Sequence, residues 1–162
     1  MRLSRPAFAA IILLAALASA QERAADGPPI VGVWKLNVEK STVRIPPDAI
    51  EIRQYNMRPD GFLVGLLITG TPRAYHYLQF VAKSDGKDYP EYSDVIVSDW
   101  LAAGTPTPRA YAERTIDEYT TEWIDKVNGR VTAQGKKIVS KDRKTLTITV
   151  DGSPAVRIYD RQ

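Results

Sequence analysis

The sequence predicts an all-β protein, an antiparallel up-and-down meander closed into a barrel of about eight to ten strands. Three observations lead to this prediction. Apolar and polar residues alternate with a period of two in several segments. Four Gly-containing dipeptides that favour hairpin turns lie between those segments. No segment repeats its apolar residues at helical spacing, and closure removes the exposed edges that a long open meander would leave.

Residues 1–20 have the pattern of a secretory signal peptide. Arg2 and Arg5 precede an apolar run that ends at Leu17, and Ala18-Ser19-Ala20 is a small-residue cleavage pattern. The apolar run is shorter than the roughly 20 residues of a membrane-spanning helix, and no later stretch reaches that length. We therefore predict cleavage near Ala20, no membrane span, and export to the periplasm or the medium.

Residues 21–29, QERAADGPP, are a predicted flexible leader, and residues 30–162 are predicted to form a single β-barrel domain. Cleavage removes two of the 22 Lys and Arg residues and none of the 19 acids, which leaves a net charge of +1. A chain without a basic stripe offers nucleic acid no electrostatic footprint, so no nucleic-acid partner is expected. The sequence has no Cys, so burial rather than disulfides must stabilise the fold.

The alternation identifies the strands in chain order. GVWKLNV, residues 32–38, is the first predicted strand and places Trp34 and Leu36 on one face. AIEIRQYNM, residues 49–57, follows it. KTLTITV, residues 144–150, is the clearest case, because its apolar residues share one face and its threonines the other, as on a half-solvated sheet.

The connections between strands have turn chemistry. Residues 99–110, DWLAAGTPTPRA, contain two prolines and a glycine and are predicted to be a surface insert. The dipeptides that tolerate a positive φ in tight hairpin turns are Asp60-Gly61, Asp85-Gly86, Asn128-Gly129 and Asp151-Gly152.

Four segments together resemble a family of small exported bacterial proteins of unassigned function. They are GVWKLN, AKSDGKDYP, NGRVTAQGKKIVSKDRKTLTIT and RIYDRQ, and the resemblance covers most of residues 31–162. The sequence departs from the family at the insert of residues 99–110. It departs again at Arg143, where the family usually has Gly, which leaves open the type of the turn at Asp142-Arg143.

Two ends of the chain also resemble the calycin barrels. Gly32-x-Trp34 is similar to the opening signature of lipocalins and fatty-acid-binding proteins. AVRIYDR resembles the last strand of fatty-acid-binding proteins, where Arg and Tyr two residues apart hold a carboxylate. The resemblance implies a ligand-binding barrel in which Arg157 and Tyr159 point inward.

The same resemblance carries two further implications. Calycin barrels often pack a basic side chain over the Trp at their closed end, and Arg157 and Arg161 both qualify for that place over Trp34. Fatty-acid-binding proteins have a two-helix lid after the first strand, whereas EKSTVRIPPDA contains Pro46-Pro47 and cannot hold two helices.

Two interpretations of the last strand remain open. Arg157 and Tyr159 alternate with Val156 and Ile158, so one pair faces the interior and the other faces out. If Val156 and Ile158 face inward, the strand contributes only to the core. If Arg157 and Tyr159 do, an anionic ligand would satisfy the buried guanidinium.

Metal and cofactor sites are not expected. His76 is the only histidine, which excludes a multi-histidine zinc site. SDGKDYPEYSD, residues 84–94, gathers four acids but lacks the spacing of a calcium loop, and Asp85-Gly86 is explained by a turn. Trp123 is expected in the barrel wall or core.

We therefore expect a lipocalin-like barrel, monomeric or weakly dimeric, that binds a small apolar or amphipathic, anionic ligand. The predicted ligand contacts are Arg157, Tyr159, His76 and Trp34. An alternative is a barrel enzyme, an isomerase or hydrolase with His76 and Tyr159 as acid and base, but no residue is assigned as catalytic. A third is an envelope interaction module with a filled barrel.

Overall fold

The structure, a computed structural model, describes residues 27–46, 48–93 and 108–162. Within these residues all regular structure is β, which confirms the predicted class, and the number of strands lies at the upper end of the predicted range. The strands are β1 (Gly32–Leu36), β2 (Ile50–Met57), β3 (Leu63–Thr71), β4 (Ala74–Ala82), β5 (Tyr89–Ser93), β6 (Arg109–Asp117), β7 (Thr120–Val127), β8 (Arg130–Val139), β9 (Thr145–Val150) and β10 (Val156–Arg161).

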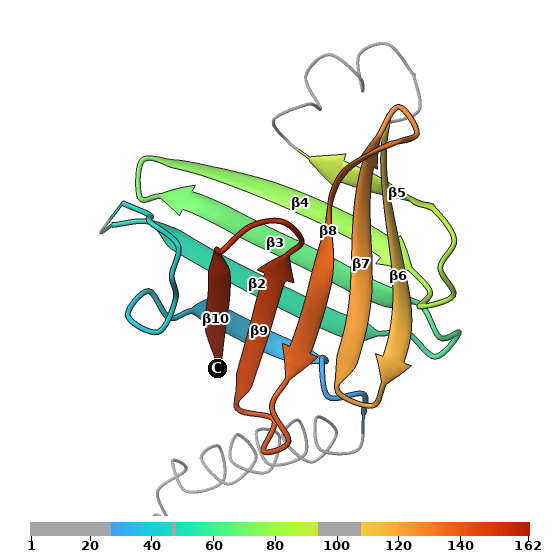
Figure 1. Cartoon of the computed structure of the whole chain (residues 1–162), viewed down its shortest axis with the longest axis horizontal. Coiled ribbons are helices and arrows are strands. Elements are labelled where there is room, and N and C mark those ends of the chain that lie inside the picture. Colours follow the sequence, from blue (N-terminus) through green and yellow to red (C-terminus); the bar gives the residue numbers. More distant parts are fainter. Residues whose placement is uncertain (1–26, 47, 94–107) are drawn as a thin grey trace, which may run out of the picture.

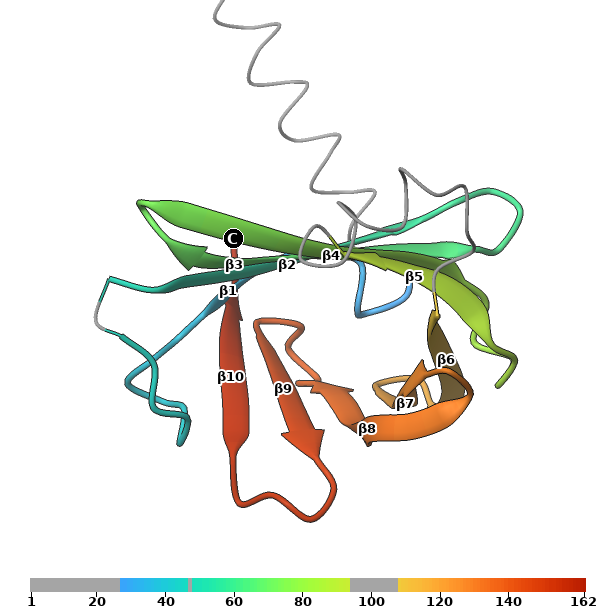
Figure 2. The same ribbon diagram turned by 90° about the horizontal axis from the view of Figure 1, so that it is seen from above.

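The strands form one closed antiparallel barrel, as predicted. Each strand pairs with its neighbours in the chain, and β1 closes the sheet by pairing with both β2 and β10. In Figure 1 the strands β2, β3 and β4 cross behind the upright β6 to β10, and Figure 2 shows these two groups facing each other. Among the described residues, the β5–β6 ladder pairs Tyr89 with Tyr111 and Pro90 with Ala110, so this seam is short.

All four predicted turn dipeptides lie between consecutive strands, and their glycines have φ values of 74° to 80°. Asn128 also takes the left-handed conformation, with φ of 51°, as a two-residue primed turn requires. The turn left open at Asp142-Arg143 uses the same conformation, since Arg143 has φ of 57°. Arg143 thus adopts a backbone conformation that Gly takes without strain.

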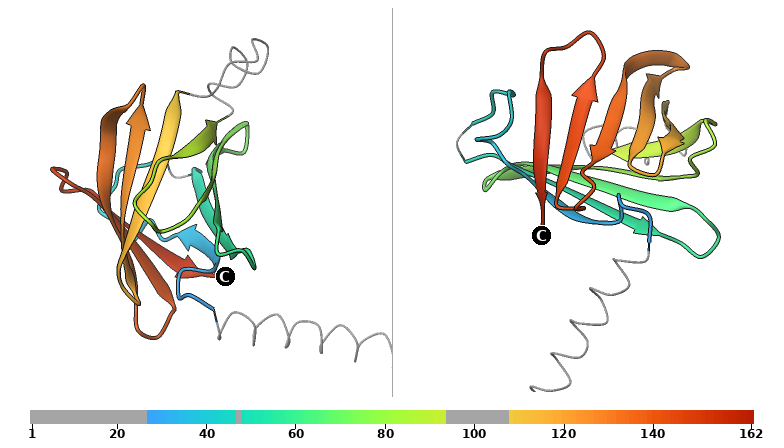
Figure 3. Two further views of the ribbon diagram at one scale, coloured as in Figure 1. Left: turned by 90° about the vertical axis from the view of Figure 1, so that its right-hand side faces the viewer. Right: turned by 60° about the horizontal axis from the view of Figure 1, so that its bottom comes forward.

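Trp34 closes one end of the barrel. It is fully buried, its Nε1 donates a hydrogen bond to the carbonyl of Ile30 over 2.8 Å, and it pairs in register with Arg161. The Arg161 guanidinium lies 4.1 Å from the centre of the Trp34 ring, so Arg161 rather than Arg157 packs over the tryptophan. Figure 3 shows the end of β10 beside β1.

Arg161 also ties the chain before β1 to this closed end. Its two terminal nitrogens donate to the carbonyls of Val31 and Pro29 over 2.7 and 2.6 Å, and its Nε donates to the carbonyl of Arg143. Five N–H donors in a planar fork make Arg suited to gathering several carbonyls at once. Residues 27–29 of the predicted leader therefore lie against the barrel.

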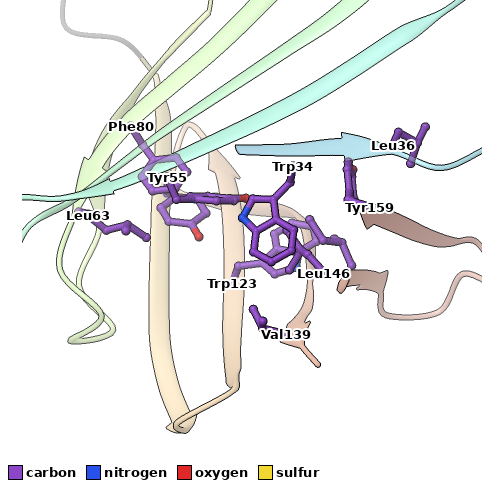
Figure 4. Packing of buried hydrophobic residues seen from close by; sticks show 12 residues of the cluster. Trp34, Leu36, Tyr55, Leu63, Phe80, Trp123, Val139, Leu146 and Tyr159 are labelled. Carbon is purple, nitrogen blue, oxygen red and sulfur yellow. The ribbon is translucent and has the colours of Figure 1, made fainter. Parts of the chain in front are cut away.

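The core fills the barrel interior around the closed end (Figure 4). Phe80 and Tyr111 stack with ring centres 3.7 Å apart, and Trp123 lies in the core as expected. The buried apolar and aromatic side chains are Trp34, Leu36, Tyr55, Leu63, Phe80, Ala82, Tyr111, Trp123, Val139, Leu146, Ile148 and Tyr159.

Several sequence predictions fall outside the described residues. These are the signal peptide of residues 1–20, most of the leader, and residues 99–107 of the predicted surface insert. The last two residues of the predicted insert, Arg109 and Ala110, begin β6. None of the described residues forms a helix with the length and apolarity needed to cross a membrane.

Truncating Trp34 tests the closure. Trp34→Ala removes a fully buried ring and the surface on which Arg161 rests, so we expect a loss of about 3–5 kcal/mol in the free energy of unfolding. Urea titration measures it. Tyr75→Ala is the matched control, because Tyr75 is half exposed and should change stability little. Equal stabilities of the two variants would contradict the assigned closed end.

Candidate ligand-binding site

Arg157 and Tyr159 lie on the inner face of β10. Their register partners on β9, Ile148 and Leu146, are buried in the core, and directly paired residues of an antiparallel ladder point to the same face. Tyr159 is fully buried, whereas the Arg157 side chain remains about one third exposed, at 32%. The inner pair on this strand is therefore the polar one.

The carboxylate that these two residues contact belongs to the chain itself. Tyr159 donates its hydroxyl proton to Glu51 and accepts a hydrogen bond from Arg53 Nε over 2.9 Å. Arg157 Nε lies 3.5 Å from Glu51 Oε2. Burial, followed by the charge of Glu51, raises the pKa of Tyr159 despite the opposing Arg53. Two guanidinium groups thus face one carboxylate, and this group of four residues, the Glu51 cluster, keeps one positive charge in excess.

A second polar cluster lies deeper in the barrel. Lys137 is 3% exposed and donates to Glu113 Oε2 over 2.9 Å and to the hydroxyl of Tyr111. Tyr111 and Ser84 each donate to Glu113, over 2.5 and 2.6 Å. Burial alone would raise the pKa of Glu113, but the ammonium and these donors outweigh burial and lower it. Aromatic rings at 4.9 to 5.2 Å surround the ammonium, which adds cation–π attraction.

A third cluster spans the short β5–β6 seam. Glu91 on β5 is 1% exposed and accepts a hydrogen bond from Arg109 on β6. Burial, and after it the charge of Asp125, raise the pKa of Glu91 to about 7, while Arg109 opposes both. Burial also raises the pKa of Asp125. Two carboxylates therefore share the field of one guanidinium, and Glu91 titrates near neutral pH.

Two cavities adjoin these clusters. The inner cavity, about 80 Å³, is lined by Arg53, Leu67, Leu78, Phe80, Glu91, Tyr111, Trp123, Asp125, Lys137 and Ile148. The end cavity, about 290 Å³, is lined by residues 28–30, Met57, Leu63, Ser84, Glu113, Thr115, residues 117–121, Lys137 and Val139. Lys137 lines both, so the two cavities adjoin at its side chain.

The predicted contact residues are placed differently from one another. Trp34, His76, Arg157 and Tyr159 do not line either cavity, although Arg53 joins the Glu51 cluster to the inner one. Trp34 belongs to the closed end. His76 is exposed on the β3–β4 hairpin, beyond the ladder that β5 forms with Leu78–Phe80.

This placement bears on the enzyme alternative and on metal binding. The acid and base of that alternative are an exposed His76 and a buried Tyr159, and they do not converge on either cavity. Among the described residues, no three His, Cys, Asp or Glu side chains are grouped closely enough to hold a metal ion. In the acidic segment of residues 84–94, Asp85 accepts a hydrogen bond from Tyr89, and Asp88 accepts one from Lys126.

The most buried charged residues, Lys137, Glu113 and Glu91, are not among the predicted contact residues. One signal was present for Lys137, because Gly135, Lys137 and Val139 alternate on one face of β8. A core Val139 therefore places Lys137 inside the barrel.

Comparisons with known proteins support the fold. No protein-family model matches the chain, and no curated protein matches its sequence. One similar solved structure is a mutant of the fluorescent protein UnaG, with a TM-score of 0.53, 13% identity, and coverage of 83% of this chain and 96% of that chain. Another is a Schistosoma mansoni fatty-acid-binding protein in complex with arachidonic acid, with a TM-score of 0.51, 17% identity, and coverage of 84% and 99%. The chain has a calycin-like β-barrel fold.

Glu91 gives the protein a defined dependence of stability on pH. The folded chain binds this proton more tightly than the unfolded chain, where Glu has a pKa of about 4.3, so the free energy of unfolding falls as pH rises between the two values. The slope reaches about 1.4 kcal/mol per pH unit. Glu91→Gln should remove this contribution to the pH dependence of the unfolding free energy.

Urea titrations from about pH 4 to pH 9 measure this effect. The difference in unfolding free energy between the wild type and Glu91→Gln should change up to about pH 7 and then stay constant. Glu122→Gln is the control, because Glu122 forms a surface ion pair with Arg114. A difference that is constant over the whole range would contradict the raised pKa of Glu91.

Proposed function

We propose that this chain is an exported, lipocalin-like carrier that binds a small amphipathic ligand inside its barrel. The observation that carries the proposal is the end cavity, which combines apolar walls with a buried ammonium at its inner boundary. Ligand sites in proteins are concave, mostly apolar, and contain a few polar groups that fix orientation. The geometry therefore favours a ligand with an apolar body and one polar head.

The apolar body would occupy the end cavity. Ile30, Leu63 and Val139 supply its apolar walls, and its volume of about 290 Å³ is close to the lower limit of about 300 Å³ for ligand pockets. A ligand of one or two rings, or a short alkyl chain, fits this space. Burying its apolar surface would supply most of the affinity.

The polar head would point inward. Asp117 and Glu118 are exposed at the outer rim of the end cavity, and Glu118 lies 3.8 Å from the guanidinium of Arg143, so it is the charge of Asp117 that disfavours an anion at the rim. At the inner boundary the head meets Lys137, whose charge Glu113 compensates, and, beyond it, the inner cavity with Arg53. The excess positive charge of the Glu51 cluster adds to the field there. We therefore infer an anionic head group.

Arg157 and Tyr159 contribute to this preference through the Glu51 cluster. Arg157 and Arg53 together exceed the charge of Glu51 by one, and Arg53 lines the inner cavity. One of the similar structures is a complex with arachidonic acid, an apolar chain with a carboxylate head. An amphipathic anion is the ligand class that both observations favour.

A matched pair of fluorescent probes tests the proposal. Anilinonaphthalene sulfonate is an amphipathic anion, and phenylnaphthylamine has the same ring skeleton without the charge. We expect both to bind, and the anion to bind more tightly. Arg157→Ala should lower the affinity for the anionic probe about tenfold, because it removes the excess positive charge. The affinity for the neutral probe should not change. Arg58→Ala, which removes an exposed charge paired with Asp60, is the control.

A second variant locates the apolar body. Met57 lines the end cavity, so Met57→Trp should narrow the cavity and lower its affinity for both probes. Val131→Trp adds the same ring at an exposed position of β8 and should change neither affinity. Fluorescence titration gives the dissociation constants. Equal binding of the two probes by the wild type would refute the anionic preference, and no effect of Met57→Trp would refute the proposed cavity.

Export predicts the mass of the mature chain. In protein recovered from the periplasm or medium of its own host, intact-mass spectrometry should show a chain that begins at Gln21. A mature chain that begins elsewhere would refute the proposed cleavage site. Recovery of the full precursor from the cytoplasm would refute export.

A further inference from the structure

The inner cavity contains an acid pair and an unused donor. Glu91 on β5 and Asp125 on β7 both line it, and Arg109 hydrogen-bonds to Glu91 at its edge. Trp123 also lines the cavity and is 8% exposed. Its indole Nε1 is buried and has no hydrogen-bond partner in the part of the chain that the structure describes. A buried N–H without an acceptor is costly, so the cavity favours a guest that brings an acceptor atom.

The surrounding charges determine the sign of that guest. Arg53 from β2 and Lys137 from β8 line the cavity together with the two carboxylates. Arg109 faces it from β6 through its contact with Glu91, while β4 contributes the uncharged Phe80 and Leu78. Three cations and two carboxylates therefore lie at the cavity. Behind them, Glu51 lies between Arg53 and Arg157, and Glu113 pairs with Lys137, so the charges of these described groups cancel while Glu91 is ionised.

Protonation of Glu91 changes this balance in favour of an anion. Burial, together with the charge of Asp125, raises the pKa of Glu91 to about 7, so this carboxyl takes up a proton near neutral pH. The neutral form leaves Arg109 with less compensating charge. An entering oxyanion would restore the charge that the proton removed, so the anion and the proton favour each other's binding.

We propose that the inner cavity binds an oxyanion of carboxylate size together with one proton on Glu91. An oxygen of the anion accepts a hydrogen bond from Trp123 Nε1 and lies in the field of Arg53, Arg109 and Lys137. The proton comes from the solvent and binds the Glu91 carboxylate, so the net charge of the cavity is unchanged. The volume of about 80 Å³ accommodates a head group and excludes a longer body.

This inference rests on the proposed function, since it names the site of the ligand's head group. A cationic head group is disfavoured on two grounds. It would require both Glu91 and Asp125 to stay ionised beside three resident cations, and it would leave the Trp123 N–H without an acceptor.

Acetate and its neutral analogue acetamide are probes small enough for the cavity. Proton–nitrogen correlation spectra of the full chain report the indole N–H of each tryptophan, and Trp123→Phe identifies the signal of Trp123. Acetate should shift this signal. Its dissociation constant should be about tenfold larger at about pH 8 than at about pH 6, because Glu91 loses its proton in that interval. Acetate itself stays ionised at both values.

The variants separate proton coupling from a simple charge effect. In Glu91→Gln the acetate affinity should be independent of pH and similar to that of the wild type at about pH 6, since Gln mimics the protonated acid. Glu122→Gln should keep the pH dependence of the wild type.

Three results would overturn the proposal: equal shifts with acetate and acetamide, an acetate affinity that does not vary with pH, or no shift of the Trp123 signal. If the naphthalene probes still bind while one of these results is found, the head-group site is wrong and the carrier proposal stands. If neither naphthalene probe binds, both proposals fail.

Discussion

The rest of the structure depends on the contact between Arg161 and Trp34, where the last strand meets the first. A ten-stranded meander has two free edges, and unpaired edge strands are prone to aggregation. Pairing β1 with β10 removes both edges. Arg161 fixes this junction by covering the tryptophan ring and by binding carbonyls before β1 and in the β8–β9 turn. Closure creates an interior, and every inward side chain must then find its partners inside the barrel.

That requirement explains the organisation of the interior into three polar clusters. An unpaired buried charge is expensive, so each charged group that the pleat directs inward has an opposite charge nearby. Glu51 lies between Arg53 and Arg157, Glu113 accepts from Lys137, and Glu91 accepts from Arg109. The pairing is complete in the second cluster. In the first a cation is in excess, and in the third two carboxylates lie close to one guanidinium, and the proposed binding of an anion and a proton rests on these two imbalances.

The fold could be predicted from the sequence because local patterns determine it. Alternation in KTLTITV, the Asn-Gly and Asp-Gly turns and the Trp34 signature matched the structure, whereas in GVWKLNV the strand ends at Leu36 and Val38 is exposed. The inner face of β10 could not be chosen, because Val156 and Ile158 fit a core as well as Arg157 and Tyr159 do. Only the register with β9, which pairs Tyr159 with Leu146, decides between them. Glu91 and Arg109 meet across a seam between separate segments, and sequence spacing contains no sign of that contact.

The location of a bound probe tests the central claim, that the ligand lies inside the barrel, most directly. Nuclear Overhauser contacts can be measured between anilinonaphthalene sulfonate and the methyl groups of the protein saturated with this probe. The account predicts contacts to Ile30, Leu63 and Val139, which line the end cavity. Contacts confined to the methyl groups of Ile68, which lies beside the exposed Tyr75 and Tyr77 on the β3–β4 hairpin, would place the probe on the outer surface and contradict the account.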